Sequence, residues 1–193
     1  MHRFFLGAAR AMAVLGGAAL TAVIALTVVS IMGRALNGWL HSAWVEGAAP
    51  GAATWLLQRG IGPVTGDFEL VEAGVAFAVF AFLPLCQIMG GHASVDLVTA
   101  RLPVRAQTGL AAMIEAVFAL ALCLIAWRLY AGMLDKQRFS ETTFMLQMPV
   151  WWAYAACLFG AAAAAVTGIY VALARLAEAA TGRSVLPPQG PGA

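Results

Sequence analysis

Four long apolar runs follow one another along the chain, over residues 11–32, 70–89, 110–127 and 150–173. Each falls within the roughly 17–25 residues that an α-helix needs to cross a hydrocarbon core about 30 Å thick. The first run is also longer than the apolar part of a cleaved signal peptide, which is about 7–15 residues. The pattern predicts an all-α integral membrane protein with four transmembrane helices, the first of them retained.

The segments between the runs differ in character. The first connection is long and rich in Gly and Ala, and residues 52–59 within it are expected to form a short interfacial helix carrying Trp55. Inside the second run, Pro84 removes a backbone hydrogen bond and predicts a kink. Residues 181–193 contain Gly and Pro and are typical of a disordered tail. Residues 1–180 are therefore expected to form one membrane domain.

Composition supports this interpretation and excludes several classes of protein. Charged residues make up only 10% of the chain, against about 25% in soluble domains. A net charge of +2 gives no basic surface of the kind that binds nucleic acid. The three cysteines lie singly in apolar segments without metal spacing, and the three histidines lie outside the apolar runs, which argues against a di-haem cytochrome. No catalytic residue, cofactor site or metal site is expected.

The aromatic residues favour one face of the predicted bundle. An even number of spans puts both termini on one side, and the positive-inside rule favours the cytoplasmic side only weakly, with six of the 11 Lys and Arg residues there. All six tryptophans then lie at the opposite face: Trp39, Trp44, Trp55, Trp127, Trp151 and Trp152. An aromatic belt at the headgroup level is the commoner use of such residues. A docking surface for a partner is the alternative.

Glu115 is the clearest charged residue inside a predicted span. A carboxylate at mid-bilayer costs about 2.5–3.5 kcal/mol or more, so it is a functional candidate by default. Glu115 lies near the end of the third helix that faces Arg101 and Arg105. A snorkelling or salt-bridged carboxylate, or a contact to a partner subunit, is favoured over a proton-transport site, because no second acid lies in the same leaflet.

Two further patterns concern packing. Asp67, Glu69 and Glu72 cluster at the other membrane face, where Arg34 and Arg59 are expected to neutralise them and hold the long loop down. Small residues recur every four positions on the fourth and first helices, at Gly160, Ala164 and Gly168 and at Ala13, Gly17, Thr21 and Ala25. Such ladders permit close helix packing in lipid, although an Ala-rich chain also produces them by chance.

The order of short motifs resembles a known family. The segments are GDFEL at 66–70, PLC at 84–86, GHASVD at 91–96, RLP at 101–103 and MPVWWAY at 148–154. Together with an acid early in the third helix, they resemble the small membrane subunit of tripartite ATP-independent periplasmic (TRAP) transporters, the DctQ-like family. The resemblance extends from the first helix to Leu173, and it is most specific at His-x-x-Val-Asp after helix two and at Pro-x-Trp-Trp-x-Tyr opening helix four.

This resemblance implies a non-catalytic subunit of a sodium-coupled secondary transporter for organic acid anions. The implied setting is the bacterial inner membrane, with both termini cytoplasmic. The implied partners are a large membrane subunit, a periplasmic substrate-binding protein and membrane lipids. Candidate motif or subunit-interface residues are His92, Asp96, Glu115, Pro149, Trp151 and Trp152, and candidates for docking the binding protein are Trp39, Trp44 and Lys136.

Two other classes of function are weaker matches to the residues. A self-sufficient four-helix transporter or channel should expose intramembrane acids along a path or contain broken helices. Only Glu115 and the predicted kink at Pro84 favour that alternative. A membrane enzyme would need clustered His, Cys or acidic ligands at one face, and the composition argues against it.

Overall fold

The computed structural model describes residues 2–42, 45, 47, 50–60, 62–90 and 103–181. Its helices are α1 (His2–Leu40), α3 (Pro50–Gln58), α4 (Asp67–Met89), α6 (Val104–Arg138) and α7 (Trp151–Thr181). By length and apolar composition, α1, α4, α6 and α7 are candidate membrane spans. The predicted all-α fold with four transmembrane helices is confirmed.

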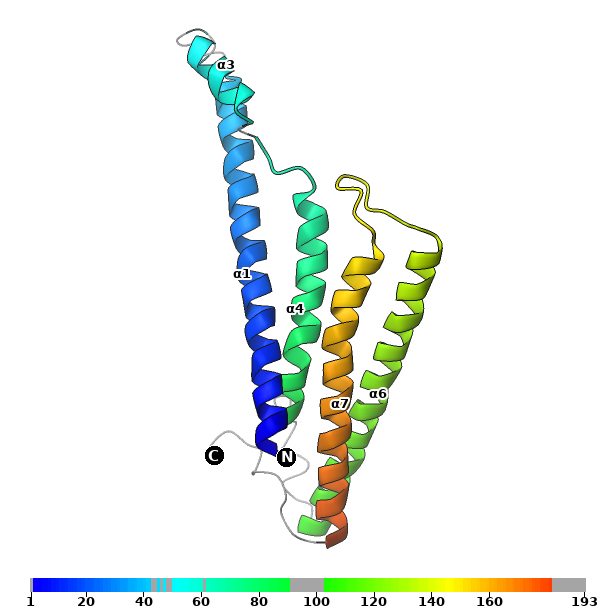
Figure 1. Ribbon diagram of the computed structural model, residues 1–193. Helices are drawn as coiled ribbons and strands as arrows, with labels where there is room; N and C mark the ends of the chain where they lie inside the picture. Colours follow the sequence, from blue (N-terminus) through cyan, green and yellow to red (C-terminus); the bar gives the residue numbers. More distant parts are fainter. Residues whose placement is uncertain are drawn as a thin grey trace.

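The four long helices lie side by side, and α1 begins at the same end of the bundle at which α7 finishes (Figure 1). We call this the N-terminal end and the opposite one the α3 end. At the α3 end, the last part of α1 and the short helix α3 rise beyond the other three helices (Figure 1). Leu40, Val45, Leu56 and Leu57 form a small hydrophobic cluster there.

The helices are longer than the apolar runs from which they were predicted. α1 begins at His2 rather than near residue 11, and α6 continues to Arg138 rather than stopping near 127. Lys and Arg favour helix almost as well as Leu, so the helix continues where hydropathy falls. α4 ends where Gly90 adopts a left-handed conformation (φ 61°) and donates its N–H to the carbonyl of Cys86, a common helix C-cap.

Two expectations about the elements stay predictions. α3 covers most of residues 52–59, for which an interfacial helix is expected, but its place relative to a membrane is not defined by the fold. α4 continues through Pro84, which is buried, and the kink expected at that residue is likewise untested. The tail expected from residue 181 lies outside the described residues, apart from Thr181 at the end of α7.

Helices α4 and α7 are the inner helices of the bundle: α7 packs against α4 and α6, and α4 packs against α1 and α7. Small residues bring these helices close together. A Cβ atom on Gly160 would lie 2.9 Å from the backbone carbonyl carbon of Phe80 in α4, and one on Gly168 would lie 3.1 Å from Leu122 in α6. Ala164, between them, is fully buried. The small-residue ladder on the fourth helix thus mediates packing within the chain.

The ladder predicted on the first helix has a different position. A Cβ atom on Gly17 would meet nothing within 4 Å, whereas one on the adjacent Gly16 would lie 2.9 Å from Ala81 of α4. The packing face of α1 is therefore one residue away from the predicted one. It includes Ala9, Met12, Gly16 and Ser30, all of which are buried.

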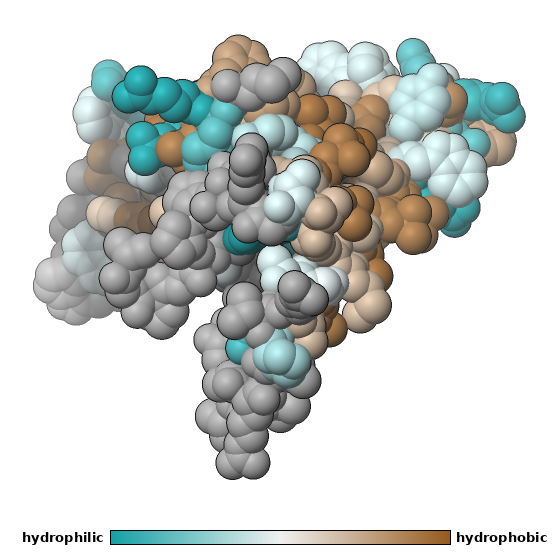
Figure 2. Space-filling model, turned by 90° about the horizontal axis from the view of Figure 1, so that it is seen from below, coloured by the Kyte–Doolittle hydropathy of each residue, from teal (hydrophilic) through white to brown (hydrophobic). Residues whose placement is uncertain are grey.

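Large apolar side chains remain exposed along the helices, including Ile24, Val79, Leu120 and Leu173. Figure 2, seen from the N-terminal end, shows apolar side chains over much of the coloured surface. A water-soluble protein rarely exposes contiguous apolar surface of this kind, whereas a membrane protein presents it to lipid or to another subunit. The protein is a multi-pass membrane protein.

Candidate functional site

The carboxylate of Asp67 joins α4 to α1 at the α3 end of the bundle. It accepts a hydrogen bond from the hydroxyl of Ser30, which is fully buried, and one from the guanidinium of Arg34 at 3.3 Å. This is the neutralisation by Arg34 that the sequence led us to expect. Arg59 has a different role, because its guanidinium lies 4.2 Å from the centre of the Trp55 ring.

Glu69 holds the connection between α6 and α7 rather than the long first loop. Its two carboxylate oxygens accept hydrogen bonds from the backbone N–H groups of Met145 at 2.6 Å and Leu146 at 3.0 Å. The same connection is closed by a bond from the N–H of Thr143 to the carbonyl of Met148 and one from the N–H of Met148 to the Thr143 hydroxyl, and a salt bridge at 2.6 Å joins Lys136 to Glu141. The carboxylate therefore fixes a folded hairpin-like segment against the first turn of α4.

Nearer the N-terminal end, Glu115 of α6 is buried against α4. Its carboxylate accepts a hydrogen bond of 2.5 Å from the side-chain amide of Gln87, and the two residues are only 7% and 1% exposed. The pairing with Arg101 or Arg105 that the sequence suggested involves side chains outside the described part. A carboxylate bonded to a buried amide between helices has the geometry of a packing contact.

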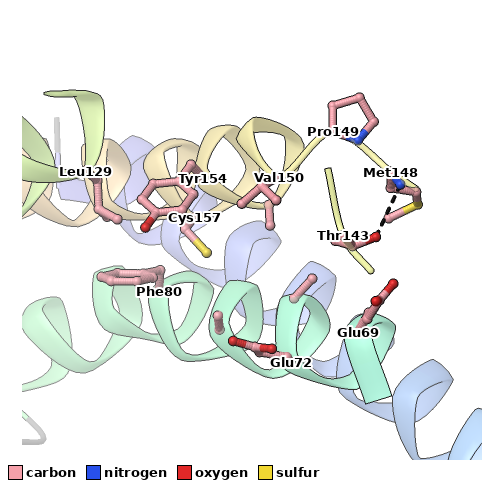
Figure 3. Close-up of a pocket in the computed structure, with 13 residues that line it drawn as sticks. Glu69, Glu72, Phe80, Leu129, Thr143, Met148, Pro149, Val150, Tyr154 and Cys157 are labelled. Carbon is pink, nitrogen blue, oxygen red and sulfur yellow. Dashed lines mark hydrogen bonds between the residues drawn. The ribbon is translucent and has the colours of Figure 1, made fainter. Parts of the chain in front are cut away.

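A cleft of about 470 Å³ lies between α4, α6 and the start of α7 (Figure 3). Its lining includes Glu72 and Phe80 of α4, Leu129 of α6, and Pro149 and Tyr154 at the start of α7. In the described part of the chain, no three His, Cys, Asp or Glu residues lie close enough together to hold a metal ion. Most of the side chains that line the cleft are apolar, and the carboxylates of Glu69 and Glu72 lie at its α3 end.

A protein-family model described as "Tripartite ATP-independent periplasmic transporters, DctQ component" matches residues 23–179, which include parts or all of the four spans. The chain belongs to the DctQ family. This is a family of transporter components rather than of enzymes, and by its definition the DctQ component works with a large membrane subunit and a binding protein. Neither a curated protein nor a solved structure matches the chain.

The predicted motif residues of this DctQ subunit fall into two groups. Pro149 precedes α7 and lines the cleft, and Trp151 and Trp152 open the helix with their rings edge to face, 6.2 Å apart. His92 and Asp96 lie outside the described residues. The part these residues play in subunit contacts stays a prediction.

The predicted docking residues are spread over the α3 end of the DctQ subunit. Trp39 lies near the end of α1 and is 55% exposed, and Lys136 lies near the end of α6. Trp44 is outside the described part of the chain. The structure thus brings Trp39 and Lys136 to the same end of the bundle, on its first and third spans.

Three polar residues that organise the DctQ bundle were not predicted from the sequence. Gln87 and Ser30 hold the two interhelical contacts described above, and Glu178 is buried against Arg175, one turn away in α7, at 2.8 Å. Ser30 and Gln87 are polar positions inside runs otherwise made of apolar residues. That interruption was the available signal, since polar side chains in membrane helices tend to bond across helix interfaces.

Proposed function

We propose that this DctQ subunit is the scaffold of a sodium-coupled, binding-protein-dependent secondary transporter for organic acid anions. The observation that carries the proposal is the family match across the four spans. Sodium coupling and the substrate class rest on what the family resemblance implies. In this assignment the large subunit binds substrate and sodium, and the present chain supports it in the membrane.

The polar contacts within the bundle favour a scaffold over a self-sufficient transporter or channel. Five polar or charged residues are buried in the described part of the chain, and each has a hydrogen-bond partner within it: Ser30, Gln87, Glu115, Thr167 and Glu178. A transport path needs acids that face a water-filled cavity or an interrupted helix. Ser30 bonds α1 to α4 through Asp67 and Gln87 bonds α4 to α6 through Glu115, so these two contacts hold helices together, while Thr167 and Glu178 bond within α7.

We place the subunit in the bacterial inner membrane with both termini in the cytoplasm. The weak excess of Lys and Arg on that side and the family resemblance support this orientation. The α3 end then faces the periplasm, where a binding protein would arrive. Exposed Trp39, together with Trp44 and Lys136, is proposed to help dock the binding protein, because Trp and charged residues suit such surfaces.

The first test is co-expression of this chain with the large membrane subunit, followed by purification in mild detergent through a tag on this chain. A stable, roughly equimolar complex is expected. Adding the binding protein and a sodium gradient to liposomes that contain the complex should then give uptake of an organic acid anion. Neither subunit should support uptake alone.

A different outcome of the same experiment would contradict the scaffold assignment. If the chain purified alone as a well-behaved oligomer and moved a solute in liposomes unaided, the scaffold assignment would be wrong. Glu115 would then become the residue to substitute, as the carboxylate buried nearest to the centre of the third span.

A further inference from the structure

The cleft between α4, α6 and the start of α7 is a candidate binding groove for another helix. α4 forms one side of the cleft, and α7 with the segment before it forms the other, while α6 contributes Leu129. α4 contributes residues 69, 72, 73, 76 and 80, and the recurrence of three and four positions among them places them on one face of the helix. Two of them are alanines, Ala73 and Ala76, and a third alanine, Ala153, comes from α7.

Glu72 is the unusual residue of this cleft. Its side chain is exposed and lies on the side of α4 that faces the cavity (Figure 3). It follows Asp67 by five residues, which places it about 7.5 Å further into the bundle at 1.5 Å per residue. Asp67 marks the level at which Arg34 from α1 pairs with α4. Glu72 therefore lies below the charged rim, on the apolar part of the helix.

No described residue forms an ion pair or hydrogen bond with the carboxylate of Glu72. Three basic residues at this end of the bundle have other contacts. Arg34 pairs with Asp67, Lys136 pairs with Glu141, and Arg59 lies over Trp55. A carboxylate at this depth is costly unless it is paired. Arg128 and Arg138 of α6 form no ion pair with Glu72 among the described residues, so charge complementarity favours a cation from outside the chain.

We propose that the cleft receives a membrane helix of the large subunit, and that a Lys or Arg on this helix pairs with Glu72. The inference rests on the proposed function and adds the place and chemistry of the contact. A helix is favoured over a lipid because small residues along the face let two helix backbones approach closely. An aliphatic lipid chain has no need of the alanines at 73 and 76.

Photo-crosslinking in the intact complex tests the position of this contact. A photoreactive amino acid at Ala76, which lines the cleft, should give a covalent product with the large subunit. The matched control is Val75, which is 40% exposed and lies on the same turn but not in the cleft. A product with lipid alone, no product at 76, or equal products at 75 and 76 would each overturn the assignment.

Charge reversal tests the pairing itself. Glu72→Lys should lower the amount of large subunit that co-purifies at least severalfold, and Glu72→Gln should lower it less. Asp135→Lys makes the same change of charge at an exposed site on α6 and should leave co-purification unchanged. The yield and gel-filtration profile of each variant expressed alone report whether it folds.

The residue that pairs with Glu72 is then identified by charge swapping. Each membrane-embedded Lys or Arg of the large subunit is changed to Glu, one at a time, and co-expressed with Glu72→Lys. One of these reversals should restore the complex. If wild type co-purifies and Glu72→Lys does so equally well, the cleft assignment fails while the scaffold function stands. If wild type itself does not co-purify, the proposed function fails first.

Discussion

At the scale of single residues, the contact between Gln87 and Glu115 joins α4 and α6, which both pack against α7. Both side chains are buried, so neither has water as an alternative partner. Loss of a partner from a buried polar group costs more than the hydrogen bond itself contributes, because the remaining group stays desolvated. This contact should therefore be sensitive to substitution.

Replacing Gln87 with Leu should lower the free energy of unfolding by about 1–3 kcal/mol, since the Glu115 carboxylate loses a donor without regaining water. Thermal unfolding of the purified complex in detergent measures the change. Glu115→Gln is the control, because an amide oxygen still accepts from Gln87, and it should retain uptake in liposomes. A stable Glu115→Gln complex that had lost uptake would favour the proton-transport interpretation instead.

At the scale of the elements, hydropathy alone identifies the four spans but not the ends of their helices. The apolar runs mark the part of each helix that suits lipid, while the helix continues through flanking residues such as Arg10, Arg128 and Arg175. The end of α4 at Gly90 is predictable from the sequence, because glycine readily adopts the left-handed conformation found there. The pairing of Gln87 with Glu115 was not predictable, because the sequence does not say which helices are neighbours.

The ladder on α7 gives a prediction for helix packing. Gly160→Ala should destabilise the bundle, because the added methyl would lie 2.9 Å from the backbone of Phe80 and must push α4 away. Gly17→Ala is the matched control, with open space at its Cβ and an expected gain of up to about 1 kcal/mol from helix propensity. Melting temperatures of the two variants, purified identically, should move in opposite directions. A common shift would mean that α4 and α7 are not in close contact.

The connection between α6 and α7 gives a second prediction at this scale. Glu69→Gln replaces a carboxylate that accepts two backbone N–H groups with an amide that has one acceptor oxygen. Hydrogen exchange at Met145 and Leu146 should become severalfold faster. Glu141→Gln removes only the exposed ion pair to Lys136 and should leave these two amides nearly unchanged. Unaltered exchange in Glu69→Gln would show that the hairpin holds its shape without α4.

At the scale of the whole molecule, the bundle has two different ends. The N-terminal end holds the start of α1 and the end of α7, while at the α3 end the long helix α1 and the short helix α3 extend beyond the rest (Figure 1). Trp39 and Trp55 are each more than half exposed there. The aromatic belt and the docking surface remain the two explanations for these side chains, and they differ in what a substitution should do.

Substituting Trp39, Trp44 and Lys136 together by Ala separates these explanations in the reconstituted transporter. If these residues dock the binding protein, the concentration of binding protein that gives half-maximal uptake should rise severalfold, because contacts with an incoming partner are lost while the membrane contacts of the subunit stay in place. The yield of complex with the large subunit should not change. Trp127, which is 62% exposed on α6, is the control for a belt residue, and Trp127→Ala should leave uptake unaltered. If Trp127→Ala and the triple substitution had equal effects on uptake, or if the complex yield fell as much as uptake, these tryptophans would belong to the membrane interface. Docking would then depend on other parts of the transporter.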